Sequence, residues 1–182
     1  GSEDALAQIP CKRIAGRPAP RGLVGGLGMG FTLASALQHI GKNGQVVVAE
    51  LVPGVIEWNR GPLGEKAGMP ILDPRAEIRC QDVAEVIKSE PLGFDAIMLD
   101  VDNGPEGLTH TGNNWLYSMA GLHACHRALR PAGILAVWSA SADRKFADKV
   151  GKAGFKVEEV QVYAHGNKGT KHTLWIGSKL KA

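Results

Sequence analysis

Hydrophobic residues occur along this sequence in short blocks with two different spacings. Some blocks are continuous apolar runs, such as the three valines at 46–48, and such runs are typical of strands buried on both faces of a parallel sheet. In other blocks the apolar residues recur every third position, as at Phe31, Ala34 and Leu37, which predicts the buried face of a helix. The order of these blocks predicts the order of the elements.

Strand-like and helix-like blocks alternate from Arg21 onward. We expect strands at 22–26, 45–51, 76–80, 94–101 and 133–139. We expect helices at 31–40, 53–60, 82–88, 113–129 and 141–153, and a loop with little regular structure at 61–75. Two further alternating segments, 155–164 and 171–177, predict a hairpin closed by the loop 165–169. Repeated strand–helix units favour an α/β fold with a doubly wound, parallel sheet, in which the hairpin makes one strand antiparallel.

The first twenty residues differ from the rest, because they are mixed in character and contain Pro10, Pro18 and Pro20. We therefore expect 1–20 to be an irregular lead-in, with Gly1-Ser2 as the remnant of an expression tag. The remaining segment, 21–182, has the length of a single domain.

Composition excludes several classes of protein. The net charge of +3 is small and the basic residues are spread along the chain, so no nucleic-acid partner is expected. No apolar run approaches the roughly 20 residues that span a bilayer, so no membrane association is expected. The cysteines, Cys11, Cys80 and Cys125, are odd in number and show no paired spacing, which favours a reducing, cytoplasmic location.

A glycine-rich segment follows the first expected strand and precedes a helix. It contains Gly25, Gly26, Gly28 and Gly30, and glycines there let the backbone approach a ligand closely. The spacing of the last three differs from the dinucleotide pattern G-x-G-x-x-G, because the final glycine comes one residue early. The segment therefore indicates a nucleoside-type ligand rather than NAD, with a simple glycine-rich turn as the alternative.

Acidic residues follow the next three strands. Glu50 ends the second strand, where a carboxylate can accept both hydroxyls of a ribose. Asp82 follows the third and could accept a hydrogen bond from an adenine amino group or simply cap a helix. Asp100 and Asp102 follow the fourth, and residues two apart on a strand share a face, so both could meet one cationic group unless they form only an acidic turn.

This order of motifs resembles the spermidine synthase family and its shorter bacterial relatives over roughly residues 21–178. The segment 129–137, Leu-Arg-Pro-Ala-Gly-Ile-Leu-Ala-Val, resembles the entry to a strand in that family. The resemblance implies a class I S-adenosylmethionine-dependent methyltransferase (Rossmann-like) fold with seven strands and a C-terminal antiparallel hairpin. It also implies that the glycine loop, with Glu50, Leu51, Asp82 and Val83, holds the adenosyl group, while Asp100 assists an attacking amine.

The donor implied by this resemblance is decarboxylated S-adenosylmethionine or S-adenosylmethionine, giving methylthioadenosine or S-adenosylhomocysteine. Asp100 and Asp102 are the expected catalytic residues. The acceptor is expected to be a small molecule, with a polyamine as one candidate, and the chain could form a homodimer. No metal is expected, because His123 and His126 share a helix without remote partners.

Three departures separate the sequence from aminopropyltransferases. Gly28 stands where that family carries an aspartate in the glycine loop, and the acids at 100 and 102 are two apart rather than three. The family's N-terminal β-domain has no counterpart here. Three hypotheses follow: an aminopropyltransferase-like enzyme, a methyltransferase acting on a small molecule, and a nucleoside-binding domain without activity.

Overall fold

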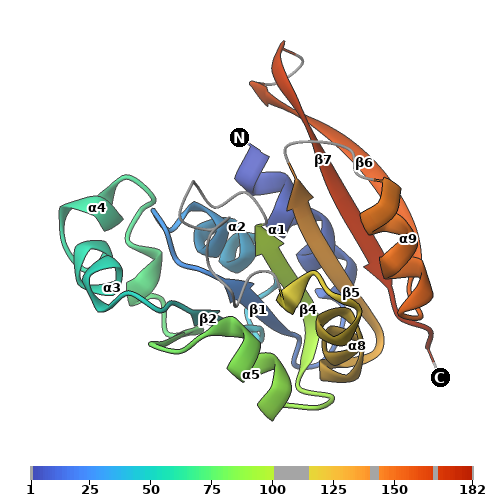
Figure 1. Ribbon diagram of the computed structural model, residues 1–182. Coiled ribbons are helices and arrows are strands. Elements are labelled where there is room, and N and C mark those ends of the chain that lie inside the picture. Colours follow the sequence, from blue (N-terminus) through green and yellow to red (C-terminus); the bar gives the residue numbers. More distant parts are fainter. Residues whose placement is uncertain (1, 101–114, 140–143, 166–167, 182) are drawn as a thin grey trace.

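The computed structural model describes residues 2–100, 115–139, 144–165 and 168–181, and its centre is a seven-stranded sheet (Figure 1). Across the sheet the strands follow the order β3-β2-β1-β4-β5-β7-β6. Their bounds are β1 Arg21–Gly25, β2 Gln45–Ala49, β3 Ala76–Arg79, β4 Phe94–Asp100, β5 Leu129–Ser139, β6 Lys156–His165 and β7 Lys168–Ser178. Strands β1 to β5 are parallel, and β7 runs antiparallel to both of its neighbours. The expected doubly wound sheet and terminal hairpin are confirmed.

Helices cover both faces of this sheet, as Figure 1 shows. The helices are α1 Ser2–Ile14, α2 Phe31–His39, α3 Pro53–Asn59, α4 Pro62–Glu65, α5 Val83–Ser89, α8 Met119–Ala128 and α9 Arg144–Lys152, with a short 3-10 helix, η1, at Pro70–Leu72. Side chains of α1, α2 and α3 share one buried cluster with one face of the sheet, and those of α5, α8 and α9 share a second cluster with the other face. Continuous apolar runs suit strands that are buried on both faces, and every residue from Phe94 to Leu99 is buried.

The expectation of an irregular lead-in at 1–20 is wrong for most of that segment, because Ser2–Ile14 is helical. Three of its buried residues, Ala7, Cys11 and Ile14, recur at intervals of four and three and pack against the sheet. Pro10 lies inside this helix and had suggested a break. The apolar stripe outweighs the hydrogen bond that proline removes, since burial of one face supplies most of the stability of a short helix.

The single helix expected at 113–129 is also wrong in its described part. The chain turns at Tyr117 and Ser118, and α8 begins at Met119 with the Ser118 hydroxyl accepting a hydrogen bond from the Gly121 N–H at 3.1 Å. The break brings backbone close together, because a Cβ added at Gly121 would lie 2.0 Å from the Trp115 carbonyl oxygen. Strand β5 then starts at Leu129 rather than at 133.

One smaller expectation needs correction, and two others fall outside the described residues. The 61–75 loop contains the short helices α4 and η1, since a proline at the first position of each favours a helical start. The expected cap Ser141 and the site residue Asp102 lie outside the described residues.

Candidate functional site

The glycine loop joins β1 to α2 at the carboxyl edge of the sheet. In this loop Gly28 has φ 51° and Gly30 has φ 87°. Both values belong to the left-handed backbone region, which residues with a Cβ rarely adopt. The loop is held to the neighbouring strand, because the Gly26 N–H donates to the Ala49 carbonyl at 2.8 Å. A second bond, from the Gly30 N–H to the Leu27 carbonyl at 2.8 Å, closes the turn before α2. The loop therefore has a defined shape at the position where ligands bind in such sheets.

Glu50 follows β2 and joins this loop to the next turn. One carboxylate oxygen, Oε1, accepts a hydrogen bond from the Leu27 N–H at 2.9 Å. The other, Oε2, accepts from the Val52 N–H at 3.0 Å. A carboxylate has about four acceptor positions, so each oxygen keeps a lone pair for a ligand after these two bonds form.

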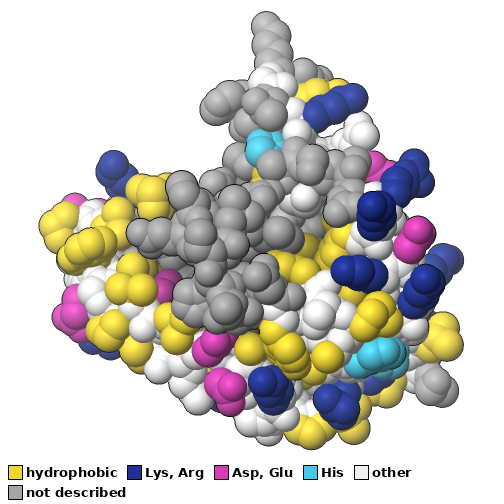
Figure 2. Space-filling view, in the orientation of Figure 1, with side chains coloured by type: hydrophobic (Ala, Val, Ile, Leu, Met, Phe, Trp, Pro, Cys, Tyr) yellow, Lys and Arg dark blue, Asp and Glu magenta, His cyan; other side chains and the backbone are white. Residues whose placement is uncertain are grey.

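The surface beside Glu50 is apolar. Leu51 and Val52, which directly follow Glu50 in the chain, are exposed. Figure 2 shows hydrophobic side chains gathered over the region of α3 and α4 at the left of the molecule. The Glu50 carboxylate therefore borders a surface that could receive a flat, apolar ring.

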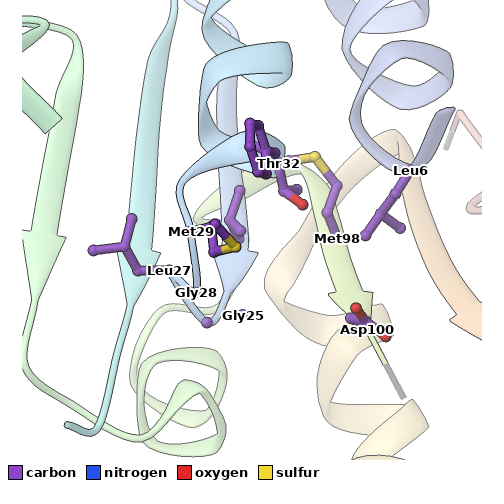
Figure 3. A pocket seen from close by; sticks show the side chains of 11 residues that line it. Leu6, Gly25, Leu27, Gly28, Met29, Thr32, Met98 and Asp100 are labelled. Carbon is purple, nitrogen blue, oxygen red and sulfur yellow. The ribbon is translucent and has the colours of Figure 1, made fainter. Parts of the chain in front are cut away.

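On the other side of the loop lies a cavity of about 250 Å³ (Figure 3). Its walls come from the loop itself, the start of α2, the end of β4 and the helix α1. The lining residues are Leu6, Val24, Gly25, Gly26, Leu27, Gly28, Met29, Phe31, Thr32, Met98 and Asp100. This volume is below the roughly 300–1,000 Å³ of most ligand pockets, so the cavity has room for part of a small ligand rather than for a whole one.

Asp100 ends the apolar strand β4 and lines this cavity together with the glycine loop, as the sequence predicted for residues that follow neighbouring strands. Among the lining residues within the described ranges it is the one carboxylate, and none of these is a lysine, arginine or histidine. The cavity therefore has an acidic side chain at one end and mainly apolar walls elsewhere, including Leu6 and Met98 (Figure 3).

Asp82 stands apart from this cavity. Its carboxylate accepts a hydrogen bond from the Ala84 N–H at 2.9 Å and caps α5, so the cap interpretation is confirmed. Leu51 and Asp82 follow β2 and β3, two neighbouring strands, and neither lines the cavity. The part proposed for Asp82 and Val83 in holding an adenine stays a prediction.

Sequence reasoning missed two kinds of residue at this edge. Leu6 lines the cavity, but it lies in a helix that the prolines had concealed. Asn59 ends α3, is 1% exposed and donates through Nδ2 to the Gly28 carbonyl at 2.9 Å. Neither placement leaves a signal in the sequence, because each brings together segments that are far apart along the chain.

In the part of the chain that the structure describes, no three histidine, cysteine, aspartate or glutamate side chains come close enough to hold a metal ion. None of the described helices combines the length and the apolar character that a membrane crossing requires.

No protein-family model matches the sequence, and no curated protein matches it either. Solved structures do match. Spermidine synthase from Thermotoga maritima has a TM-score of 0.77 at 21% identity, and the match covers 100% of this chain but 59% of that enzyme. The chain therefore spans well under two thirds of that relative. A spermidine synthase in complex with the transition-state analogue AdoDATO gives the same values of 0.77 and 21%.

Two methyltransferases match with lower scores. The 1,6-didemethyltoxoflavin-N1-methyltransferase from Burkholderia thailandensis, bound to S-adenosylhomocysteine, has a TM-score of 0.64 at 20% identity over 98% of this chain and 80% of that one. The N-methyltransferase NodS from Bradyrhizobium japonicum, also with S-adenosylhomocysteine, has a TM-score of 0.66 at 15% identity over 98% and 85%. At these identities the likeness is one of fold. The chain has the Rossmann-like fold of class I S-adenosylmethionine-dependent methyltransferases, with seven strands and an antiparallel C-terminal hairpin.

Proposed function

We propose that this chain is a transferase that binds an S-adenosyl sulfonium donor at the glycine loop and moves its alkyl group to a small acceptor. The observation that carries the proposal is the cavity between the glycine loop and Asp100. It opens at the carboxyl edge of a sheet whose structural neighbours include a spermidine synthase and methyltransferases bound to S-adenosylhomocysteine. Fold alone does not define an activity, so the proposal depends on this site.

The residues present fit such a donor in three places. The free lone pairs of Glu50 can accept the two hydroxyls of a ribose, while its bonds to the Leu27 and Val52 N–H groups hold the carboxylate in position. The exposed surface at Leu51 suits the flat face of an adenine. The chain attached to the sulfur would enter the cavity, where Leu6 and Met98 exclude water.

The donor supplies an activated carbon, because its leaving group is a neutral thioether. The protein must then place the acceptor in line with that carbon and supply an acceptor for a proton. An alkyl amine has a pKa of about 10, as lysine does, and arrives protonated at neutral pH. Asp100 would attract that cation, direct its nitrogen and accept one of its protons, which frees the nitrogen lone pair to form the new C–N bond while the C–S bond breaks and the neutral thioether leaves. Asp102 stays a candidate for binding the same charge.

The charges in the cavity favour decarboxylated S-adenosylmethionine as the donor. Among the lining residues that the structure describes, Asp100 is the one carboxylate and none is a lysine, arginine or histidine, so Asp100 would attract a donor tail that carries an amine without a carboxylate. An aminopropyl group would then be transferred, and a polyamine is the proposed acceptor. The second candidate is methyl transfer from S-adenosylmethionine, which is favoured by Gly28, because the loop lacks an acid that would repel the donor's carboxylate.

Calorimetric titration with decarboxylated S-adenosylmethionine, S-adenosylmethionine and methylthioadenosine tests this proposal. We expect Glu50→Gln to raise the Kd of the preferred donor at least about tenfold, since an amide cannot accept from two backbone N–H groups and both ribose hydroxyls. Glu57→Gln is the matched control, because Glu57 is 69% exposed and pairs with Arg60. The Kd of the donor for the Glu57→Gln variant should stay within about twofold of the wild-type value.

Turnover separates the hypotheses. With a screened set of amines, Asp100→Asn should lower kcat at least about a hundredfold. If the titration shows a preference for S-adenosylmethionine, methyl transfer replaces aminopropyl transfer as the proposed reaction. Binding without transfer to any acceptor would identify a nucleoside-binding domain, and failure of all three ligands to bind would overturn the proposal.

A further inference from the structure

Asn59 forms a buried link between helix α3 and the glycine loop. Its side chain is 1% exposed, and its Nδ2 donates to two backbone carbonyls, those of Gly28 at 2.9 Å and Val55 at 2.8 Å. Val55 belongs to the same helix, whereas Gly28 lies 31 residues earlier in the chain. The amide thus uses both of its hydrogens, one on its own helix and one on the loop.

These two bonds fix the direction of the Asn59 amide. Only the nitrogen can donate, so Nδ2 must face the two carbonyls and Oδ1 must face the other way. Oδ1 is buried and has no hydrogen-bond partner within the described ranges. It packs against Gly30, where an added Cβ would lie 3.0 Å from it. An unpaired buried oxygen opposes stability, so the value of this residue lies in the two bonds from its nitrogen.

The bond to Gly28 also fixes the following peptide unit. In a planar trans peptide the carbonyl and the N–H point in opposite directions, so a Gly28 carbonyl that faces Asn59 turns the Met29 N–H away from Asn59. Gly28 and Met29 line the donor cavity, and Asn59 does not. The loop therefore lies between Asn59 and the cavity, with Glu50 holding it at Leu27 and Asn59 holding it at Gly28.

We propose that Asn59 is a positioning residue of the donor site, which holds the Gly28–Met29 peptide unit so that the Met29 N–H is turned toward the donor. The part concerning the donor rests on the proposed function. The part concerning the loop does not, because the bond from Asn59 to Gly28 joins two groups of the chain itself.

Hydrogen exchange of the protein without ligand tests the loop directly. In Asn59→Asp an oxygen replaces the donor nitrogen at nearly the same size, so the backbone N–H groups of residues 27–31 should exchange at least about tenfold faster. Asn59→Ser keeps one donor and should give an intermediate rate. Ile56→Ala is the matched control, because Ile56 is 7% exposed in the same helix and makes no hydrogen bond to the loop. It should destabilise the protein without selectively speeding exchange in the loop.

Donor titration at a temperature at which all variants are folded supplies the second measurement. We expect the Kd to rise at least about tenfold in Asn59→Asp and to stay within about twofold in Ile56→Ala. Unchanged loop exchange in Asn59→Asp, or an equal effect in Ile56→Ala, would overturn the positioning role. If the wild type binds none of the donors, the proposed function fails, while loop exchange still decides the role of Asn59.

Discussion

At the scale of single residues, Glu50 combines two tasks in one carboxylate. It accepts the Leu27 N–H from one loop and the Val52 N–H from another, so both loops are tied to the end of β2. In the proposed function, the remaining lone pairs of the same oxygens also accept the ribose hydroxyls. A substitution at Glu50 therefore changes the shape of the site as well as its ligand contacts, and the loop must be checked whenever binding is lost.

The three cysteines differ in reactivity. Cys11 and Cys125 are buried, and burial raises the pKa of each thiol to about 12, whereas Cys80 is exposed. Because the thiolate is the reactive form, we expect one thiol to react promptly with a disulfide reagent in the native protein and all three to react in denaturant. Spectrophotometric titration counts them, and Cys80→Ser should abolish the native reaction. Any prompt thiol in that variant would contradict the burial of Cys11 and Cys125.

The residues of the site divide by how they could be predicted. Gly26, Glu50 and Asp100 follow neighbouring parallel strands, and the rule that such strand ends meet at one edge brings them together from sequence alone. Asn59 and Leu6 could not be found in this way. Their contacts depend on how α3 and α1 pack, which no local spacing records.

At the scale of elements, the end of α8 is fixed by a lysine from the last strand region. Lys179 Nζ donates to the His126 carbonyl at 2.7 Å and to the Leu129 carbonyl at 2.6 Å, and so satisfies carbonyls that a helix end leaves unpaired. The His126 ring packs edge to face on Phe155, with centroids 5.0 Å apart. This junction ties α8 to the strands that follow it.

Stability should depend on pH through this junction. Burial is the largest cause that lowers the pKa of His126 below its usual 6.5, the charges of Lys179 and His123 add to it, and a hydrogen bond to the Gly154 backbone opposes them. The folded state then binds fewer protons than the unfolded state, so the free energy of unfolding falls as pH drops through about 6.5. Urea denaturation between about pH 7.5 and pH 5 measures this slope.

We expect His126→Gln to reduce that pH dependence, because the neutral side chain has no proton to take up. His123→Gln should reduce it less, since it removes a charge but leaves the burial of His126 unchanged. An identical slope in the wild type and in His126→Gln would show that other groups carry the dependence.

Element boundaries show where sequence patterns lose information. The strands at 45–49 and 94–100 were predicted closely, because buried parallel strands have continuous apolar runs. The helix expected at 113–129 was not, since its periodicity continues across the turn at Ser118. A serine inside an apparently helical pattern can cap a new helix, and only the tertiary structure shows which role it takes.

At the scale of the whole molecule, charge gathers at the amino edge of the sheet, opposite the site. The Asp95 carboxylate is buried and forms ion pairs with the side chains of Arg17 and Arg130, the latter through Nη1 at 3.0 Å. It also accepts a hydrogen bond from the backbone N–H of Arg21 at 2.9 Å. These partners come from the segment after α1, from β1 and from β5. One carboxylate thus joins distant parts of the chain at the edge where no ligand is proposed to bind.

Removing that carboxylate should be costly. Asp95→Ala leaves two arginines without their buried partner, and we expect the free energy of unfolding to fall by about 3 kcal/mol. Arg13→Ala is the control, because its pair with Glu158 at 2.8 Å is exposed on both sides and should contribute less than about 1 kcal/mol. Equal losses in urea denaturation would show that Asp95 carries no special share of the stability.

The helix α1 has a consequence for how the chain is made. It packs on β4 and β5, and its Leu6 forms a wall of the donor cavity. During synthesis α1 leaves the ribosome well before those strands, so its apolar face must stay uncovered or be shielded by α2 until residue 139 has emerged. The described lining of the cavity runs from Leu6 to Asp100, so a nascent chain must extend at least to the end of β4 before these walls can come together.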